Sequence, residues 1–208
     1  MFGDASLSFR EFAMHESLPL ATIQDAVLDF LRGRDDAVLF GAQAVNAYVR
    51  ESRATEDVDI ISPRAEALAE ELRQFLADRF HISVRTREVN DRAGYGVYQV
   101  REPENRHLID LYGVETLPAH REVEKVQVVV PDELIARKVV THVRHAKSGK
   151  GSIDLADIRR LLLAYPQLKS EQGSVRQRLI ELAASDAVLA AWSEIAASDI
   201  PEDDEDDV

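Results

Sequence analysis

Two carboxylates stand within a stretch that otherwise has the composition of a buried strand. The segment RATEDVDIIS, residues 53–62, alternates Asp57 and Asp59 with apolar residues. Side chains alternate with period two along a strand, so both aspartates are predicted to share one face, with Val58 and Ile60 on the other. Two carboxylates on one face repel each other, and a divalent cation removes that conflict. The segment therefore predicts a Mg²⁺ site, the alternative being two aspartates that face water on an exposed sheet.

A third aspartate and a glycine extend this pattern. Asp110 lies inside the apolar segment 107–114, HLIDLYGV, where an isolated aspartate would be more typical of an edge or a turn. Gly41 follows the apolar run 37–40 and precedes a helical pattern. Glycine lets the backbone approach a ligand, and the first N–H groups of a helix bind phosphate. The corner is thus interpreted as a nucleotide site next to the aspartates, the alternative being an ordinary tight turn.

A dense group of basic residues provides positive charge for phosphates. The stretch Ala136–Lys150 contains Arg137, Lys138, His142, Arg144, His145, Lys147 and Lys150. We interpret it as a phosphate clamp, although basic residues near the C-terminus of a solvated helix also favour the helix dipole. Asp154 is predicted near the start of the next helix, where Ser152 would be the N-cap, so that Asp154 has either a functional or a capping role.

Composition and charge limit the classes of function. The chain has 208 residues, a net charge of −13 and no cysteine, which excludes disulfides and thiolate metal sites. A protein this acidic does not coat nucleic acid through its overall field. No secretory signal or apolar span is recognisable, so a cytoplasmic protein without membrane partners is expected. The acidic tail 198–208 is predicted to be disordered, either as a solubilising tail or as an acidic mimic that competes for a basic site.

Periodicity predicts an α+β fold, with a mixed β-sheet flanked by helices and followed by a helical subdomain. The predicted domains are an α/β domain over 1–130, a helical subdomain over 131–197 and the tail. Helices are expected over 22–34, 42–52, 63–80 and from Pro131 onward, and strands over 37–40, 57–62, 81–89, 94–102, 107–114 and 124–130. Tyr95 and Tyr98 fall on a predicted hairpin, where they either pack within the sheet or stack on a base.

The segment LFGAQAVNAYVRESRATEDVDII, residues 39–61, resembles the signature of the nucleotidyltransferase superfamily (polymerase-β-like fold), in which a glycine corner precedes a D-x-D strand. The R-x-T-x-D-x-D form, from Arg53 to Asp59, is similar to the AbiEii-type toxin branch. The later stretch 131–162 looks like the helical half of that family, where a lysine is followed by an aspartate on the next helix. The resemblance covers residues 40–163.

The resemblance implies a nucleotidyltransferase-like fold and Mg²⁺-dependent transfer of a nucleotide from an NTP to a tRNA end or a protein hydroxyl. It further implies the toxin of a toxin–antitoxin or abortive-infection system, with a cognate antitoxin as partner. The implied catalytic residues are Asp57, Asp59, Asp110, Lys138 and Asp154, with the first three as metal ligands. The implied nucleotide-binding residues are Gly41, Ala42, Arg53, Thr55, Lys138, Arg144 and Asp157. In that family the glycine corner is usually Gly-Gly or Gly-Ser, whereas this chain has Gly41-Ala42. The alternative is therefore a non-catalytic module that binds a nucleotide or a partner.

Overall fold

The computed structural model of the chain describes residues 18–89 and 94–200. The sequence-based expectations for the N-terminal segment before residue 18 and for residues 201–208 of the acidic tail therefore lie outside the described residues. The chain divides into two compact units, the first ending at Val129 and the second beginning at Val130. Among the described residues, no helix combines the length and the apolar character needed to cross a membrane.

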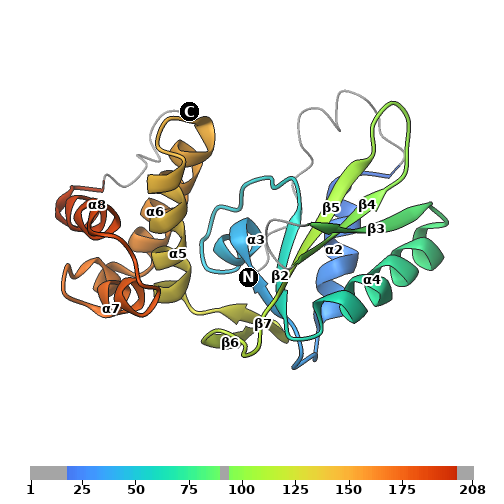
Figure 1. Ribbon diagram of the computed structural model, residues 1–208, viewed down its shortest axis with the longest axis horizontal. Helices are drawn as coiled ribbons and strands as arrows, with labels where there is room; N and C mark the ends of the chain where they lie inside the picture. The colour runs from blue at the N-terminus through green and yellow to red at the C-terminus, as the bar shows by residue number, and fades with distance from the viewer. Residues whose placement is uncertain (1–17, 90–93, 201–208) are drawn as a thin grey trace. The chain divides into compact units, whose positions relative to one another are not determined.

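The first unit is a mixed sheet of seven strands in the order β3-β4-β5-β2-β1-β7-β6. Figure 1 labels β2 to β7 of this sheet. Strand β2 runs parallel to β5, and β1 runs parallel to β7, while all other neighbours are antiparallel. This confirms the predicted α+β class. The elements are α2 (Leu20–Leu31), β1 (Val38–Phe40), α3 (Gly41–Asn46), β2 (Val58–Ser62), α4 (Ala65–Phe80), β3 (Val84–Val89), β4 (Gly94–Gln99), β5 (Arg106–Gly113), β6 (His120–Val123) and β7 (Val126–Val129).

Helices α2 and α4 cover one face of the sheet, and α4 contacts β2, β3, β4 and β5. Their apolar residues recur at helical spacing, as in Leu68, Leu72 and Leu76, which are fully buried. On the strands, Ile60 and Ile109 belong to the same buried layer. Because strand side chains alternate between faces, the residues between these positions point to the opposite face of the sheet.

Two elements of the first unit differ from the sequence-based expectation. The helix expected over 42–52 ends at Asn46, whose side-chain amide donates to the Arg53 carbonyl (2.9 Å) and accepts from the Arg53 N–H (3.1 Å), holding the following loop. Strand β6 was not predicted, because its four residues are mostly exposed and polar. It pairs with β7 through a tight turn in which Glu124 and Lys125 both have positive φ, a conformation usually signalled by Asn-Gly.

The second unit is entirely helical in its described residues. It comprises α5 (Pro131–Arg144), α6 (Gly149–Ala164), the 3₁₀ helix η1 (Pro166–Lys169), α7 (Ser174–Glu181) and α8 (Asp186–Ala197). Trp192 is fully buried in this unit, and its indole N–H donates to the Glu171 carbonyl at 3.1 Å. Helix α6 begins one turn earlier than expected, with Ser148 rather than Ser152 at the N-cap position, so Asp154 lies inside the helix and has no capping role.

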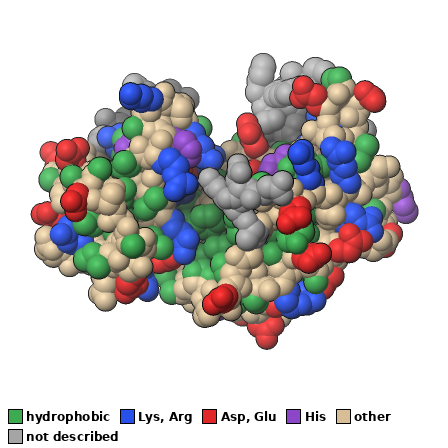
Figure 2. All heavy atoms as spheres, viewed as in Figure 1, with side chains coloured by type: hydrophobic (Ala, Val, Ile, Leu, Met, Phe, Trp, Pro, Cys, Tyr) green, Lys and Arg blue, Asp and Glu red, His purple; other side chains and the backbone are tan. Residues whose placement is uncertain are grey.

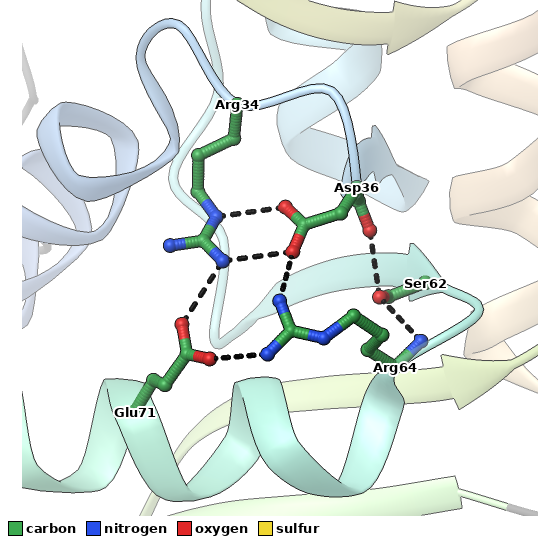
Figure 3. Close-up of polar contacts among 5 residues, drawn as sticks. All are labelled: Arg34, Asp36, Ser62, Arg64 and Glu71. Carbon is green, nitrogen blue, oxygen red and sulfur yellow. Dashed lines mark hydrogen bonds and ion pairs between the residues drawn. The ribbon is translucent and has the colours of Figure 1, made fainter.

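A network of charged side chains ties the loop before β1 to the end of β2 and to α4 (Figure 3). Asp36 receives two hydrogen bonds from Arg34, at 2.9 and 2.8 Å, and one from Arg64 at 2.6 Å. Glu71 on α4 accepts one bond from each arginine, at 2.9 and 2.7 Å. Ser62 donates to the Asp36 carbonyl at 2.7 Å. The hydrogen bonds from Arg34 are the largest influence on the pKa of Asp36 and, with Arg64, lower it despite burial.

We predict that Asp36→Asn lowers the free energy of unfolding at pH 7 by about 1–2 kcal/mol, because two guanidinium groups lose a charged acceptor. A carboxyl whose pKa is lowered by folding stabilises the fold above its ordinary value of 3.8 and loses that contribution as the pH falls through the lower folded value. The deficit of the variant should therefore shrink below pH 4 or so in urea titrations. The exposed neighbour Asp35, changed to Asn, is the control, and a pH-independent deficit would contradict the assignment.

Candidate functional site

The aspartates that the sequence singles out gather on the face of the sheet opposite α4. Asp59 and Asp110 are direct register partners on the parallel strands β2 and β5. Asp57 is the residue before β2, and its carboxylate lies close to that of Asp110. Register partners of adjacent strands project to the same side of a sheet, so three carboxylates from two strands are concentrated in one place.

His107 lies between two of these carboxylates. Its Nδ1 is 3.4 Å from Asp57 Oδ2, and its Nε2 is 3.0 Å from Asp110 Oδ1. Burial is the largest single influence on the pKa of His107 and lowers it. The close contact with the Asp110 carboxylate, together with the charge of Asp57, outweighs burial and raises the pKa of His107 above its ordinary value. The surrounding carboxylates therefore favour the protonated form of His107, and in that form the ring is a counter-ion to Asp57 and Asp110.

The sequence did not identify His107, for a geometric reason. His107 and Asp110 are three residues apart, and in a regular strand such residues point to opposite faces. The register between β4 and β5 shifts at this position, because Val97 pairs with Ile109 while Tyr98 pairs with His107. A β-bulge of this kind re-aims a side chain, and here it turns the imidazole toward the aspartates. A histidine three residues before an aspartate in an apolar strand was the only signal available.

Asp59 is held by the glycine corner and by a tyrosine. Gly41 has φ of +66°, and a Cβ atom built on it would lie 2.6 Å from Asp59 Cγ, so no other residue fits without displacement. The Tyr112 hydroxyl lies 3.3 Å from Asp59 Oδ1 and 3.5 Å from Asp110 Oδ2. These distances are long for O–H···O bonds, and the single proton of Tyr112 serves one carboxylate at a time.

The donor atoms in this cluster fit a hard divalent cation. One ligand atom from each of Asp57, His107 and Asp110 lies within 4.8 Å of the others. Carboxylate oxygens are the protein ligands that Mg²⁺ prefers, and adjacent Asp59 adds a further carboxylate. Imidazole nitrogen suits softer transition metals, so the aspartates are the candidate Mg²⁺ ligands and His107 is their ionic partner.

The predicted nucleotide contacts of the first unit form a polar corner around α3. Gly41 and Ala42 are its first two residues, and both are half-buried. The hydroxyl of buried Thr55 accepts hydrogen bonds from the amides of Gln24 (3.0 Å) and Gln43 (2.9 Å), which links the loop to α2 and α3. The Arg53 guanidinium donates to the Ala54 carbonyl at 3.1 Å. The structure thus gives Thr55 a role in holding the loop that leads into Asp57.

The predicted residues of the helical unit form a cluster of their own. Lys138 Nζ on α5 lies 3.1 Å from Asp154 Oδ1 and 2.8 Å from Asp157 Oδ2 on α6. All three side chains are buried, and Asp157 is also 3.6 Å from Arg160. Asp154 Oδ2 is buried with no hydrogen-bond partner among the described residues. The ammonium of Lys138 is therefore neutralised within its own unit, while one carboxylate oxygen retains an unused acceptor.

The basic stretch is only partly available for phosphate. Arg137 bonds Glu133 at 2.7 Å, and His142 Nδ1 is 2.8 Å from the Gly151 carbonyl. Arg144, in contrast, is exposed in the last turn of α5, and Lys147 and Lys150 are exposed after it. Two side chains of the stretch thus have internal contacts, and three are exposed to solvent.

We predict that Gly41→Ala lowers the free energy of unfolding by about 1–3 kcal/mol, because it adds backbone strain and displaces the Asp59 carboxylate. Gly33 is a matched control, since its φ of +74° is similar but a Cβ atom would meet nothing within 4 Å. Gly33→Ala should therefore cost only the backbone strain of about 1 kcal/mol. Equal losses for the two variants in chemical denaturation would show that Asp59 is not displaced.

We predict that Lys138→Met lowers the free energy of unfolding by about 3–5 kcal/mol, because it leaves two buried carboxylates without their cation. The triple variant Lys138→Met/Asp154→Asn/Asp157→Asn should recover part of this loss, since it removes the uncompensated charges. Chemical denaturation of both variants measures the difference. A triple variant less stable than Lys138→Met would contradict a cluster held by charge compensation.

Comparisons with known proteins place the fold of this chain. No family model matches it, and no curated protein sequence matches it. Its structure is similar to that of JHP933 from Helicobacter pylori, with a TM-score of 0.56 at 14% identity, covering 92% of each chain. A "putative nucleotidyltransferase" from the same organism gives a TM-score of 0.56 at 13% identity, covering 91% of this chain and 94% of the other.

The Megavirus polyadenylate synthase is also similar, with a TM-score of 0.55 at 15% identity over 71% of this chain. This chain spans only 32% of the length of that synthase. Sequence identities this low show a shared fold, and activity has to be inferred from the residues of the site. The chain therefore has a mixed α+β fold whose structural neighbours are nucleotidyltransferases.

Proposed function

We propose that the chain is a Mg²⁺-dependent nucleotidyltransferase. The observation that carries the proposal is the register pairing of Asp59 with Asp110 on adjacent parallel strands, with Asp57 beside them on the same open face. Neighbouring carboxylates on a sheet face are costly unless they bind cations. The nucleotidyltransferase fold of the structural neighbours and the R-x-T-x-D-x-D sequence support the same assignment.

In the proposed reaction, an acceptor hydroxyl attacks the α-phosphorus of an NTP. The new O–P bond forms as the bond from the α-phosphorus to the bridging oxygen breaks, and pyrophosphate leaves with that electron pair. Bound Mg²⁺ would stabilise the entering and leaving oxygens and lower the pKa of the attacking hydroxyl. Asp57, Asp59 and Asp110 would hold the metal, and the Asp110 carboxylate would accept the proton that the acceptor hydroxyl loses.

The residues around the aspartates have supporting roles in this proposal. Gly41 and Ala42 bring the backbone close to the triphosphate, while Arg53 and Thr55 position the loop that leads into Asp57. His107 balances the charge of the aspartates and orients Asp110.

For the helical unit, the proposal keeps the nucleotide-binding residues that the resemblance implies. Arg144 provides an exposed positive charge for phosphate. Asp154 offers its unused oxygen to a hydroxyl of the nucleotide, and Lys138, which Asp157 also contacts, holds that carboxylate in place.

The proposed acceptor is an RNA, tRNA in particular, or a protein hydroxyl, and the proposed setting is a toxin–antitoxin or abortive-infection system of the AbiEii type. The resemblance over Arg53 to Asp59 supports this branch. The second candidate is a non-catalytic module that binds a nucleotide or a partner protein. Ala42, which stands where the family usually has glycine or serine, favours that alternative because it removes a phosphate contact.

We predict that Asp57→Asn and Asp59→Asn each reduce transfer of labelled nucleotide to background, because each removes a metal-binding charge from the site. The assay incubates the chain with Mg²⁺, each of the four radiolabelled NTPs in turn, and total RNA or total protein as acceptor. Asp78→Asn, an exposed change on α4, is the matched control and should retain full transfer.

Thermal unfolding of all variants distinguishes lost chemistry from lost folding. Transfer that survives both aspartate changes would reject the proposed chemistry. A wild-type chain that binds NTP in equilibrium dialysis but labels no acceptor would favour the non-catalytic module.

A further inference from the structure

The open face of the sheet continues beyond the aspartates toward the edge strand β3. Two rows of register partners cross β5, β4 and β3 there. One row runs from Asp110 through Gly96 to Arg87, and the other runs from His107 through Tyr98 to Arg85. Figure 2 shows basic side chains beside histidine and acidic side chains over this part of the sheet. Tyr98 therefore adjoins His107 directly, and the two arginines lie one strand further along the same face.

The Tyr98 ring lies flat against this face. It stacks on His107, with ring centroids 4.7 Å apart and planes inclined by 24°. It also extends over Gly96, where a Cβ atom would lie 2.6 Å from the ring carbon Cε2 and 2.7 Å from the hydroxyl oxygen. The absence of a side chain at Gly96 therefore makes room for the ring. The ring is half-buried, so part of its surface remains accessible to a ligand.

The two arginines at the edge are suited to phosphate. Arg85 and Arg87 are both exposed, and neither guanidinium forms a hydrogen bond or an ion pair with another residue of the ranges 18–89 and 94–200. Their Cα atoms are about 7 Å apart along β3, since a strand rises about 3.4 Å per residue. Their guanidinium groups are thus available to two points of one extended chain of phosphates.

A hollow of about 660 Å³ adjoins this edge, lined in part by Arg85, Tyr98, Arg101, Glu102 and Glu104. The two glutamates would repel phosphates, so the backbone of a nucleic acid is expected to follow Arg85 and Arg87 rather than the glutamate side of the hollow.

We propose that this platform, made of Arg85, Arg87 and Tyr98, binds the single-stranded end of an RNA acceptor. A terminal base stacks on Tyr98, and the preceding phosphates contact the two arginines, which directs the terminal ribose toward Asp110. The proposal rests on the proposed nucleotidyl transfer and identifies its acceptor class. Charge complementarity favours RNA over a protein, because two neighbouring exposed arginines form a local basic site in a chain whose net charge is −13.

The test measures binding of a fluorescein-labelled single-stranded RNA of twelve nucleotides to the full chain by anisotropy, with Mg²⁺ and without NTP. Arg85→Gln/Arg87→Gln should reduce the slope of log K against log salt by about 1.4, or about 0.7 for each phosphate that the variant no longer neutralises. Tyr98→Ala should weaken binding on the order of tenfold, and Tyr98→Phe should bind like the wild type, because the ring is retained.

A matched double variant controls for net charge. Arg73→Gln/Arg79→Gln removes the same charge from α4, which covers the opposite face, and should leave RNA binding unchanged. Equal losses in the two double variants, unchanged binding by Tyr98→Ala, or a wild type that does not bind RNA would each overturn the platform. RNA binding that needs Arg85, Arg87 and Tyr98 in a chain that transfers no nucleotide would instead refute the proposed function alone. Nucleotide transfer with an unchanged KM for RNA in these variants would refute the platform alone.

Discussion

Mutual repulsion among carboxylates on one face of a sheet is the constraint around which the first unit is built. Asp59 and Asp110 are register partners on adjacent strands, and Asp57 lies beside them. Such a concentration of charge needs a nearby cation. His107 provides one from the chain itself when its ring is protonated, and Gly41 leaves the space that the Asp59 carboxylate occupies. Because the clustered carboxylates need a cation, this face is suited to Mg²⁺, and a bound Mg²⁺ would in turn attract phosphate.

The division of the sheet into two unlike faces makes this concentration compatible with a stable fold. The face under α2 and α4 is apolar, and its leucines and isoleucines are fully buried. It supplies the hydrophobic free energy, while the opposite face keeps its aspartates and arginines half-buried or exposed. The ionic network around Asp36 joins the loop before β1 to α4 at the edge of this arrangement. The hydrophobic core and the proposed catalytic site therefore lie on opposite sides of one sheet.

The helical unit handles buried charge differently. Lys138 is enclosed by Asp154 and Asp157, so the ammonium and the carboxylates compensate one another inside the unit. Burial makes such a cluster sensitive to the loss of a single member, whereas the exposed end of α5 tolerates charge freely. The resemblance predicted nucleotide contacts at these positions. The structure adds that Lys138 also joins α5 to α6, so that substitutions there change folding as well as any contact with a nucleotide.

The sequence by itself determined the α+β class and most helices and strands. It also singled out the three aspartates and the glycine corner as candidate site residues. These depend on periodicity and on residue types within a few positions, which neighbouring residues alone can specify. The tertiary structure decided the role of His107, because a register shift between β4 and β5 turns its ring to the acidic face. It also decided the partners of Lys138, because they lie on the next helix. Strand β6 likewise became visible only in the structure, because its turn lacks the usual glycine. Pairing register and long-range contact are properties of the packed chain, and no local pattern contains them.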